Sequence, residues 1–505
     1  MVITQITSGA KQFVPRLGGD VIGINQTPSG SQYSISLSNN TIKIISAGDL
    51  DSVSEISGII SPSSSTSSKP VLAPSTVALL QPHHSNLYIN GPISSPSSST
   101  LQCYDLLTDR QSLRFETSLT SRTKWTGKEK RPVLEPQMTC AQFTADGDWL
   151  ATVEEWEDKY ALDEVSSYEV FLKIWRWREK GWDLVAKIEN PHGIDGHVLG
   201  ITSPSPATTT TGALKASDNN REFATLGSEG SIKIWRAYKN SHGNVSETIW
   251  SLYRTIGSST STTQTHGAII YSPDNSVLIA GIGGYIHLIN ATSGHLVKSL
   301  HLGHSINKLD ILGRHLISLH DNMSIFSGWD LSSGQIVFSE RLDRPHSSIA
   351  VNPLTSTMAI ASASEKGKST ITISSMTMKG KVNKTKISVD SAVSHLLSTT
   401  STDMDSLAGF LFVDNAGQVG HITNLRASQG SAPLRPVATD YSVVVPGSKF
   451  ISGHVTRTDG DARKRKRMQT TMPGVTMRDK DISQVLQMEG LDIMQMYEAI
   501  LLNGV

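Results

Sequence analysis

Three groups of basic residues carry the side chains whose type and spacing could do chemistry in this chain of 505 residues. Lys and Arg bind phosphate groups, and a Trp among them can stack on an unpaired base. The first group is a continuous run, in which self-repulsion keeps the chain extended and accessible. The run comprises Arg463, Lys464, Arg465, Lys466 and Arg467. We interpret it as a nuclear-import signal or a nucleic-acid contact, with a solvated charged linker as the alternative.

The other two basic groups lie where we expect loops between strands. One flanks a predicted strand at 370–374 and has no acidic residue from 366 to 389. It contains Lys366, Lys368, Lys379, Lys381, Lys384 and Lys386. The other surrounds Trp125 and contains Arg122, Lys124, Lys128, Lys130 and Arg131. Both are candidate RNA contacts, because each phosphate neutralised by a Lys or Arg adds to affinity without reading sequence. Ordinary surface lysines are the alternative for both groups.

No pattern of a catalytic or cofactor site accompanies these groups. The chain contains no G-x-x-x-x-G-K-[ST], H-E-x-x-H, C-x-x-C or G-x-S-x-G sequence. Its two cysteines, Cys103 and Cys140, are too few for a disulfide framework or a four-cysteine zinc site. We therefore predict a protein that is not an enzyme and has no cofactor, metal or small-molecule substrate. A hydrolase with scattered carboxylates on its loops is the alternative, because a fold excludes no chemistry.

Composition indicates short strands and turns rather than long helices. Apolar residues make up 37% and charged residues 18% of the chain, and Gly reaches 40. Lys plus Arg and Asp plus Glu are equal at 45 each, so no overall field attracts nucleic acid or an anionic membrane. The first residues lack the pattern of a signal peptide, and no apolar stretch is long enough to span a bilayer. We expect no membrane association.

A repeated unit of strands runs through the chain. Four segments read as an apolar strand, a Pro, Gly or Asp turn and a second apolar strand: 24–37, 141–153, 269–281 and 349–361. Third strands follow at 41–45, 171–175, 231–235, 285–289, 324–330 and 370–374, with weaker copies at 98–106 and 416–422. The copies lie roughly 40 to 60 residues apart, which is typical of four-stranded propeller blades. We predict an all-β, WD40-type β-propeller.

Two Gly-His pairs support blades of the WD type. His197 precedes Trp235, and His304 precedes Trp329, each in the order of such a blade. In WD blades a buried His joins a hydrogen-bonded set with a strand hydroxyl, a turn acid and the Trp, since a buried polar ring must find partners. We therefore predict structural roles for His197, Trp235, His304 and Trp329, and neither metal binding nor catalysis.

The repeats divide the chain into five predicted parts. These are a remnant blade of a preceding propeller at 1–60, a Ser-rich linker at 61–70, a propeller at 71–445, a basic flexible linker at 446–480 and C-terminal helices at 481–505. Seven blades would close the propeller and leave the first one over, and an eight-bladed ring is the alternative. Residues Ile493, Met494, Tyr497, Ile500 and Leu501 form one apolar face of the last helix. That face is expected to pack on the propeller or on a partner.

Several segments resemble a known family. They are FVPRLGG (13–19), GDWLATVEEWED (147–158), FLKIWRW (171–177), KIENPHG (187–193) and TLGSEGSIKIWR (225–236). In them the chain resembles the U3 small nucleolar RNA-associated protein 17 family, also called Nan1 or WD repeat-containing protein 75, in a fungal form. The resemblance covers about residues 13 to 430. Family members have two tandem propellers and a C-terminal extension, and this chain is expected to lack most of the first propeller.

The resemblance implies a function. Family members belong to the t-UTP/UtpA subcomplex of the small-subunit processome. It implies a nucleolar scaffold in pre-rRNA processing and 18S rRNA maturation that supports RNA polymerase I transcription. The implied partners are other t-UTP/UtpA subunits, the 5′ external transcribed spacer of pre-rRNA and the U3 small nucleolar ribonucleoprotein. The alternative is a WD-repeat adaptor in another complex, serving ubiquitin transfer or trafficking.

Overall fold

The computed structural model is built from strands. It describes residues 2–4, 9, 11–13, 17, 20–38, 40–59, 77–90, 100–108, 110–118, 136–158, 167–179, 181–194, 196–205, 221–242, 245–257, 264–320, 325–331, 333–341, 346–353, 355–363, 368–376, 382–399, 409–414, 418–424 and 441–444. No helix occurs among these residues. The segments in which apolar and polar residues alternate form strands, as predicted. Alternation suits a strand because its successive side chains point to opposite faces.

Seven four-stranded antiparallel sheets follow one another in the described chain from residue 78 to residue 444. In each sheet the strands pair in chain order. Blade 1 contains β7 (Ala78–Leu80), β8 (Asn86–Asn90), β9 (Thr100–Asp105) and β10 (Arg110–Glu116). Blade 2 contains β11 (Gln137–Phe143), β12 (Trp149–Asp158), β13 (Ser167–Arg178) and β14 (Gly181–Glu189). Blade 3 contains β15 (Val198–Thr202), β16 (Glu222–Gly227), β17 (Ile232–His242) and β18 (Val245–Ile256).

The remaining four blades have the same plan. Blade 4 contains β19 (Gly267–Tyr271), β20 (Val277–Ile282), β21 (Tyr285–Asn290) and β22 (Leu296–His301). Blade 5 contains β23 (Ile306–Leu312), β24 (His315–His320), β25 (Ile325–Asp330) and β26 (Gln335–Arg341). Blade 6 contains β27 (His346–Asn352), β28 (Thr357–Ala363), β29 (Ser369–Met376) and β30 (Val382–Val389). Blade 7 contains β31 (Val393–Thr399), β32 (Gly409–Asp414), β33 (Val419–Asn424) and β34 (Tyr441–Val444).

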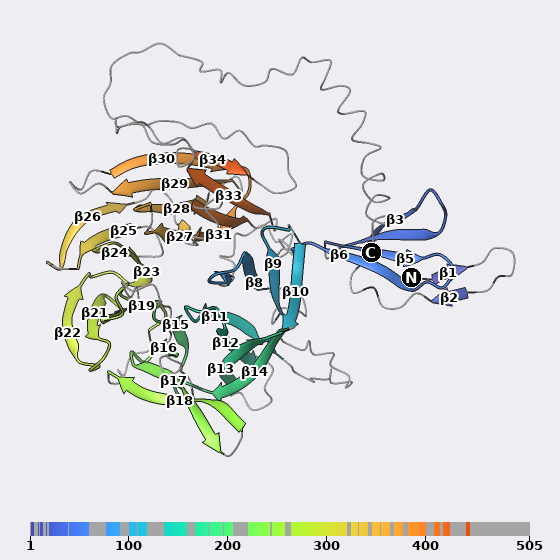
Figure 1. Cartoon of the computed structure of the whole chain (residues 1–505). Helices are drawn as coiled ribbons and strands as arrows, with labels where there is room; N and C mark the ends of the chain where they lie inside the picture. Colours follow the sequence, from blue (N-terminus) through green and yellow to red (C-terminus); the bar gives the residue numbers. More distant parts are fainter. Residues whose placement is uncertain are drawn as a thin grey trace, which may run out of the picture. The chain divides into compact units, whose positions relative to one another are not determined.

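The first strand of each blade lies next to the first strands of the two neighbouring blades. Strand β7 contacts β11, and the contacts continue through β15, β19, β23 and β27 to β31. Strand β31 in turn contacts β7, which closes the ring (Figure 1). A closed ring of radial sheets is a β-propeller, in which each sheet covers the apolar faces of its neighbours.

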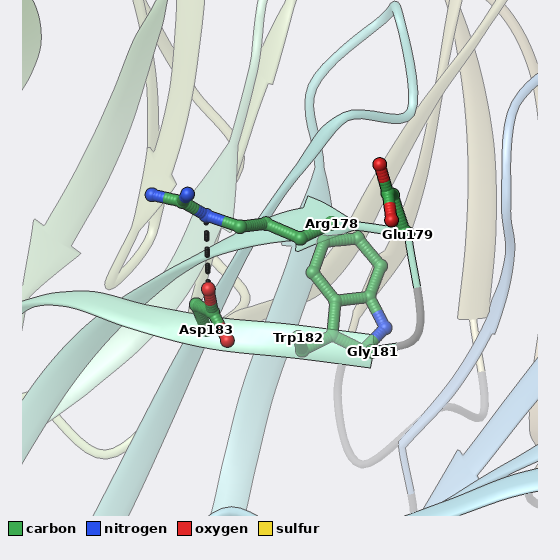
Figure 2. Close-up of a pocket in the computed structure, with 5 residues that line it drawn as sticks. All are labelled: Arg178, Glu179, Gly181, Trp182 and Asp183. Carbon is green, nitrogen blue, oxygen red and sulfur yellow. Dashed lines mark ion pairs between the residues drawn. The ribbon is translucent and has the colours of Figure 1, made fainter.

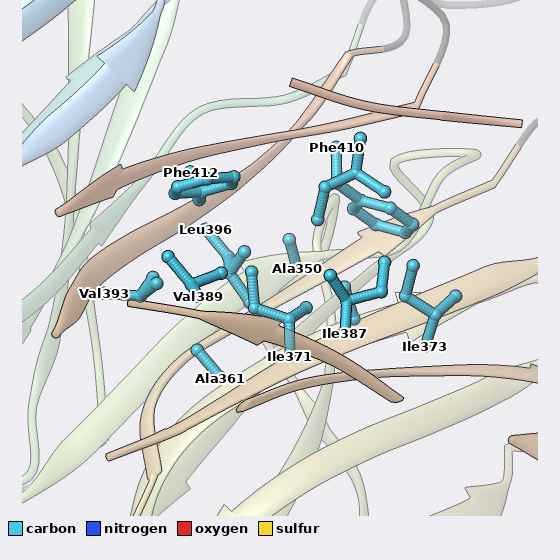
Figure 3. Packing of buried hydrophobic residues seen from close by; sticks show 12 residues of the cluster. Ala350, Ala361, Ile371, Ile373, Ile387, Val389, Val393, Leu396, Phe410 and Phe412 are labelled. Carbon is cyan, nitrogen blue, oxygen red and sulfur yellow. The ribbon is translucent and has the colours of Figure 1, made fainter. Parts of the chain in front are cut away.

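The apolar core lies between blades rather than within them. The cluster between blades 6 and 7 combines side chains of both sheets, among them Ile371 and Ile373 of β29, Leu396 of β31, and Phe410 and Phe412 of β32 (Figure 3). Each of these five side chains is at most 2% exposed. A blade removed from the ring would expose such residues on both faces, so burial depends on the neighbouring blades.

Tight turns join the first and second strands of several blades, as the Pro, Gly and Asp positions predicted. In blade 2, Asp146 Oδ1 accepts a hydrogen bond from the backbone N–H of Asp148, 3.1 Å away. Gly147 follows with φ of 73°, and a Cβ there would lie 2.8 Å from the carbonyl oxygen of Pro82. Glycine therefore satisfies both the left-handed backbone and the close approach at this turn.

A further sheet precedes the ring. It contains β3 (Val21–Gln26), β4 (Gln32–Leu37), β5 (Thr41–Ser46) and β6 (Ser52–Ser57), and β1 (Val2–Thr4) pairs with β2 (Lys11–Phe13) before it. We call the sheet β3–β6 the N-terminal blade. A small cluster formed by Ile35, Leu37, Ile45 and Leu50 is its buried core. Its first strand is almost wholly exposed.

The predicted fold class, an all-β WD40-type propeller with an extra N-terminal blade, is confirmed. Every third strand predicted from the sequence is the third strand of a sheet, including the weaker copies, which are β9 and β33. The five domain boundaries stay predictions. The basic linker at 446–480 and the helices at 481–505 lie outside the described residues. No helix capable of crossing a membrane occurs in the described part of the chain.

Candidate functional site

The third strands of blades 2, 3 and 5 share one buried contact. In each, a Trp donates its indole N–H to the hydroxyl of a residue on the second strand of the same sheet. The pairs are Trp175 with Thr152 at 2.9 Å, Trp235 with Thr225 at 3.0 Å and Trp329 with Ser318 at 3.1 Å. Each bond satisfies a polar group that burial would otherwise leave unpaired.

Blade 3 extends this contact into a chain of four side chains. His192 Nε2 lies 2.9 Å from Thr225 Oγ1, and His192 Nδ1 lies 2.6 Å from Glu229 Oε1. Burial alone would raise the pKa of Glu229, but hydrogen bonds from His192 and Ser231 outweigh it, and the pKa is lowered. The set joins the loop before β15 to the turn between β16 and β17.

The histidine of this set is therefore His192, and the prediction for His197 was wrong. Asn190 and Gly193 have φ of 46° and 95°, and the turn that they make directs His192 inward. His197 instead directly precedes β15, and its side chain is 47% exposed. It contacts Tyr168 Oη at 2.5 Å and lies 3.4 Å from Glu155 Oε2.

The prediction for His304 was also wrong. His304 is exposed, and its ring centroid lies 6.4 Å from that of His320. His320, at the end of β24, is the buried imidazole near Trp329 in blade 5. Its Nε2 lies 3.0 Å from Ser327 Oγ and 3.4 Å from Ser318 Oγ, the acceptor of the Trp329 N–H. The imidazole thus comes from the second strand of the sheet and not from the loop before the first.

Of the candidate RNA contacts, three lysines fall on described residues. Lys368 Nζ lies 2.7 Å from Asp390 Oδ1, and Lys384 forms an ion pair with Glu340 of the preceding blade. Lys386 is exposed. Carboxylates from outside residues 366–389 therefore pair with two of these lysines. This pairing reduces the positive potential that the lysines offer to phosphate.

The other candidates lie outside the described residues. They are Lys366, Lys379 and Lys381, the group Arg122, Lys124, Trp125, Lys128, Lys130 and Arg131, the run Arg463, Lys464, Arg465, Lys466 and Arg467, and the apolar face Ile493, Met494, Tyr497, Ile500 and Leu501. These assignments stay predictions.

A buried ion pair in blade 2 is linked to the end of blade 1 by a backbone hydrogen bond. Lys173 Nζ lies 2.7 Å from Glu154 Oε2, and it also donates to the backbone oxygen of Thr117, 2.6 Å away. The two side chains are 6% and 0% exposed. Removing one partner would leave the other charge buried alone, and the bond from Lys173 to Thr117 holds the end of blade 1 against blade 2.

Titratable side chains also occur on the first strands of blades 5 and 7. Lys308 Nζ donates to the backbone oxygen of Ile349 at 3.1 Å. Burial raises the pKa of Asp310 to about 6. Burial, with Lys308 contributing, lowers the pKa of His395 to about 3. No cluster of three or more His, Cys, Asp or Glu that could hold a metal occurs among the described residues.

A surface cavity of about 520 Å³ lies at the β13–β14 hairpin (Figure 2). It is lined by Arg178, Glu179, Gly181, Trp182 and Asp183. Arg178 Nε lies 2.9 Å from Asp183 Oδ2, and the indole N–H of Trp182 donates to Tyr88 Oη at 3.2 Å. The cavity residues therefore supply an ion pair, an indole bound to Tyr88 and the carboxylate of Glu179.

Comparison with known proteins assigns the ring to a protein family. Residues 79–398 match the family described as WD repeat-containing protein 75 second beta-propeller. The chain belongs to this family. Its matched part extends from blade 1 to the first strand of blade 7, so the family's second propeller corresponds to the closed ring.

Relatives in yeasts and vertebrates support the assignment. U3 small nucleolar RNA-associated protein 17 of Schizosaccharomyces pombe is 24% identical over 325 residues, covering 60% of this chain and 38% of the relative. NET1-associated nuclear protein 1 of Saccharomyces cerevisiae is 25% identical over 340 residues, covering 59% and 36%. WD repeat-containing protein 75 of Homo sapiens is 28% identical over 188 residues, covering 37% and 20%. The chain matches well under half the length of each.

In this member of the WD repeat-containing protein 75 family, sequence reasoning missed three structural residues. Trp175 ends FLKIW as Trp235 ends SIKIW, and this parallel could have identified it together with Thr152. His192 stands in Pro-His-Gly, a turn sequence in which Gly193 adopts positive φ. His197 was predicted instead because it belongs to a Gly-His pair, and it lies five residues after His192.

Proposed function

We propose that this chain is a non-enzymatic propeller scaffold of the small-subunit processome, acting in pre-rRNA processing and 18S rRNA maturation and supporting RNA polymerase I transcription. The observation that carries the proposal is the family match over residues 79–398, which covers the closed ring. The names of two relatives, a U3 small nucleolar RNA-associated protein and a nuclear protein, support a setting in the nucleus and nucleolus.

The architecture suits a scaffold. Buried polar groups in blades 2, 3 and 5 are used in bonds that hold strands and loops together, such as Trp235 to Thr225 and Lys173 to Glu154. The rigid ring presents loops and outer strands at fixed spacing, so several modest contacts can act together without one deep site. The proposed partners are t-UTP/UtpA subunits, the 5′ external transcribed spacer of pre-rRNA and the U3 small nucleolar ribonucleoprotein.

Location and association test the proposal together. A fluorescent fusion of the full chain, expressed in a fungal host, is expected in the nucleolus, and its affinity purification is expected to enrich U3 small nucleolar RNA and pre-rRNA. A fusion that stays cytoplasmic and enriches neither RNA would favour an adaptor in another complex and contradict the proposal.

The basic run is the proposed import signal. Replacing Arg463, Lys464, Arg465, Lys466 and Arg467 with alanine is expected to reduce nuclear fluorescence at least several-fold, because import signals of this kind depend on clustered positive charge. A heterologous import signal added to the same variant is expected to restore the nucleolar pattern. Unchanged nuclear entry of the alanine variant would assign the run to the charged linker instead.

A further inference from the structure

Most of β18 and all of blade 4 come from a stretch of the sequence with very few carboxylates. From residue 248 to residue 309 the sequence has one acidic residue, Asp274, although the whole chain of 505 residues has 45. The same stretch contains Arg254, Lys298 and Lys308. A stretch with one acidic residue repels phosphate only weakly, and the Glu222 carboxylate of β16, which lies beside it, is paired with Arg236.

Three rings gather on the outer half of blade 4. Tyr285, the first residue of β21, pairs across the sheet with His301 at the end of β22, and their ring centroids lie 4.7 Å apart. His287 lies on the same face as Tyr285, with its ring 6.0 Å away and tilted by 11°. His287 Nδ1 lies 2.8 Å from Ser299 Oγ, which fixes this ring. Tyr285 is 47% exposed, so part of its side chain is accessible to solvent.

A fourth exposed ring lies on the outermost strand of blade 3. Tyr253 is 41% exposed and lies against the guanidinium groups of Arg236 and Arg254, at 3.7 Å and 5.2 Å from the ring centroid. Arg236 is paired with Glu222 at 2.7 Å and therefore serves to hold the ring. Arg254 Nη1 donates to the backbone oxygen of Thr292 at 2.8 Å.

The bond from Arg254 to Thr292 links the outermost strand of blade 3 to blade 4. Thr292 lies in the turn between β21 and β22, the same two strands that carry Tyr285, His287 and His301. Blades 3 and 4 are neighbours in the ring (Figure 1). From Tyr285 to Thr292 an extended chain spans about 20 Å, so the two tyrosines are separated by the length of several nucleotides at most.

We propose that the surface formed by Arg236, Tyr253, Arg254, Tyr285, His287 and His301 binds single-stranded RNA. Unpaired bases stack on the solvent-accessible parts of the Tyr285 and Tyr253 rings, and Arg254 contacts the phosphate backbone. Base stacking on aromatic side chains is sequence-tolerant, because every base has a π-face, and duplex RNA cannot use it. The choice of RNA as the polyanion rests on the proposed function, whereas the rings and the lack of carboxylates are independent of it.

Binding of a short fluorescein-labelled oligouridine to the purified full chain, followed by fluorescence anisotropy, tests the proposal. The double variant Tyr253→Ala, Tyr285→Ala is expected to raise Kd at least tenfold, because each stacked base contributes about 1–3 kcal/mol. Tyr285→Phe keeps the ring and is expected to keep the affinity. Arg254→Gln is expected to reduce the slope of log affinity against log salt by about 0.7.

Tyr238→Ala is the matched control. Tyr238 is an exposed tyrosine of the same blade, 42% exposed, and makes none of the contacts above. Its variant is expected to bind within twofold of the wild type. Equal losses in Tyr238→Ala and the double variant, unchanged binding in the double variant, or tighter binding of duplex RNA or of an acidic peptide would each overturn the proposal. Thermal unfolding of each variant shows that the fold is retained.

The test separates this surface from the proposed function. If the chain copurifies with pre-rRNA but the purified protein does not bind oligouridine, the surface is refuted and the scaffold role stands. If oligouridine binding is lost in the double variant while the chain copurifies with neither pre-rRNA nor U3 RNA, the surface stands and the processome role is refuted.

Discussion

The N-terminal blade and a blade of the ring share a four-stranded antiparallel plan and bury their side chains very differently. On β3, the first strand of the N-terminal blade, Ile22 is 73% and Ile24 48% exposed. On β23, the first strand of blade 5, Leu309 is 6% and Ile311 7% exposed. The first strand of a ring blade is therefore buried by the neighbouring blades, whereas β3 has no such cover among the described residues.

The same contrast applies to charged pairs. In the N-terminal blade Lys43 and Glu55 form an ion pair at 3.2 Å with side chains 21% and 46% exposed, whereas Lys173 and Glu154 in the ring are almost completely buried. Water solvates the first pair and is excluded from the second. Equivalent substitutions in the two regions should therefore differ greatly in their effect on the free energy of unfolding.

The largest difference is expected for apolar truncation. Phe412→Ala removes a ring that is 1% exposed between blades 6 and 7, and it should lower the free energy of unfolding by about 3–5 kcal/mol. Ile22→Ala in the N-terminal blade should change it by less than about 0.5 kcal/mol. Urea unfolding followed by tryptophan fluorescence measures both. Similar losses in the two variants would mean that another part of the protein covers β3.

Breaking the buried ion pair comes next. Lys173→Met leaves Glu154 buried without its cation and should cost about 3–5 kcal/mol, whereas Lys43→Met should cost less than about 1 kcal/mol. Urea titration of both variants gives the comparison. Adding Glu154→Leu to Lys173→Met should recover most of the stability, because no buried charge then remains. Failure of this rescue would assign the loss to the bond with Thr117.

The histidines of blade 3 should differ by a smaller amount. His192→Ala leaves the Thr225 hydroxyl and the Glu229 carboxylate without their shared partner and should cost about 1–3 kcal/mol. His197→Ala should cost less than about 0.5 kcal/mol, because that side chain is half exposed. Thermal melting of the two variants compares them. A larger loss for His197→Ala would contradict the assignment of the hydrogen-bonded set.

The last comparison concerns the pH dependence of stability that the ring has through His395. Its pKa of about 3 in the folded chain lies below the usual 6.5, so between these pH values the unfolded chain binds a proton that the folded chain does not. Stability should therefore fall as the pH decreases below about 6.5. His395→Gln should make this decline shallower in urea titrations at a series of pH values. An identical decline would exclude His395 as a contributor.

Asp310 makes stability depend on pH in the opposite direction to His395, and it provides the control for that prediction. Its pKa of about 6 is raised, so between about pH 4 and 6 the folded chain holds a proton that the unfolded chain has released. Stability contributed by this group is lost as the pH rises through that range. Asp310→Asn should remove this loss. The difference in the free energy of unfolding between the variant and the wild type should therefore favour the variant more at pH 7 than at pH 4.

Much of the fold could be predicted because its signals are local. Alternating apolar positions in FLKIW, SIKIW and YIHLI are found in β13, β17 and β21, and turn sequences such as Ala-Asp-Gly at 145–147 join the expected strands. Strand alternation and turn chemistry depend on neighbouring residues, so a single sequence contains them. The recurrence of the unit then predicted the propeller.

The site was less predictable, because its contacts join residues far apart in the chain. Lys384 belongs to a stretch without acidic residues, yet its partner is Glu340 of the preceding blade. The surface formed by blades 3 and 4 depends on Arg254 reaching Thr292 across two sheets, which no spacing in the sequence indicates.

By itself the sequence determined that the chain makes four-stranded units, how often they recur and where their turns fall, since these follow from side-chain alternation and backbone preference within a few residues. Only the tertiary structure decided which histidine is buried, which lysines are neutralised and which tyrosines face solvent. Those outcomes depend on how neighbouring sheets approach one another, and closure of the ring sets that approach.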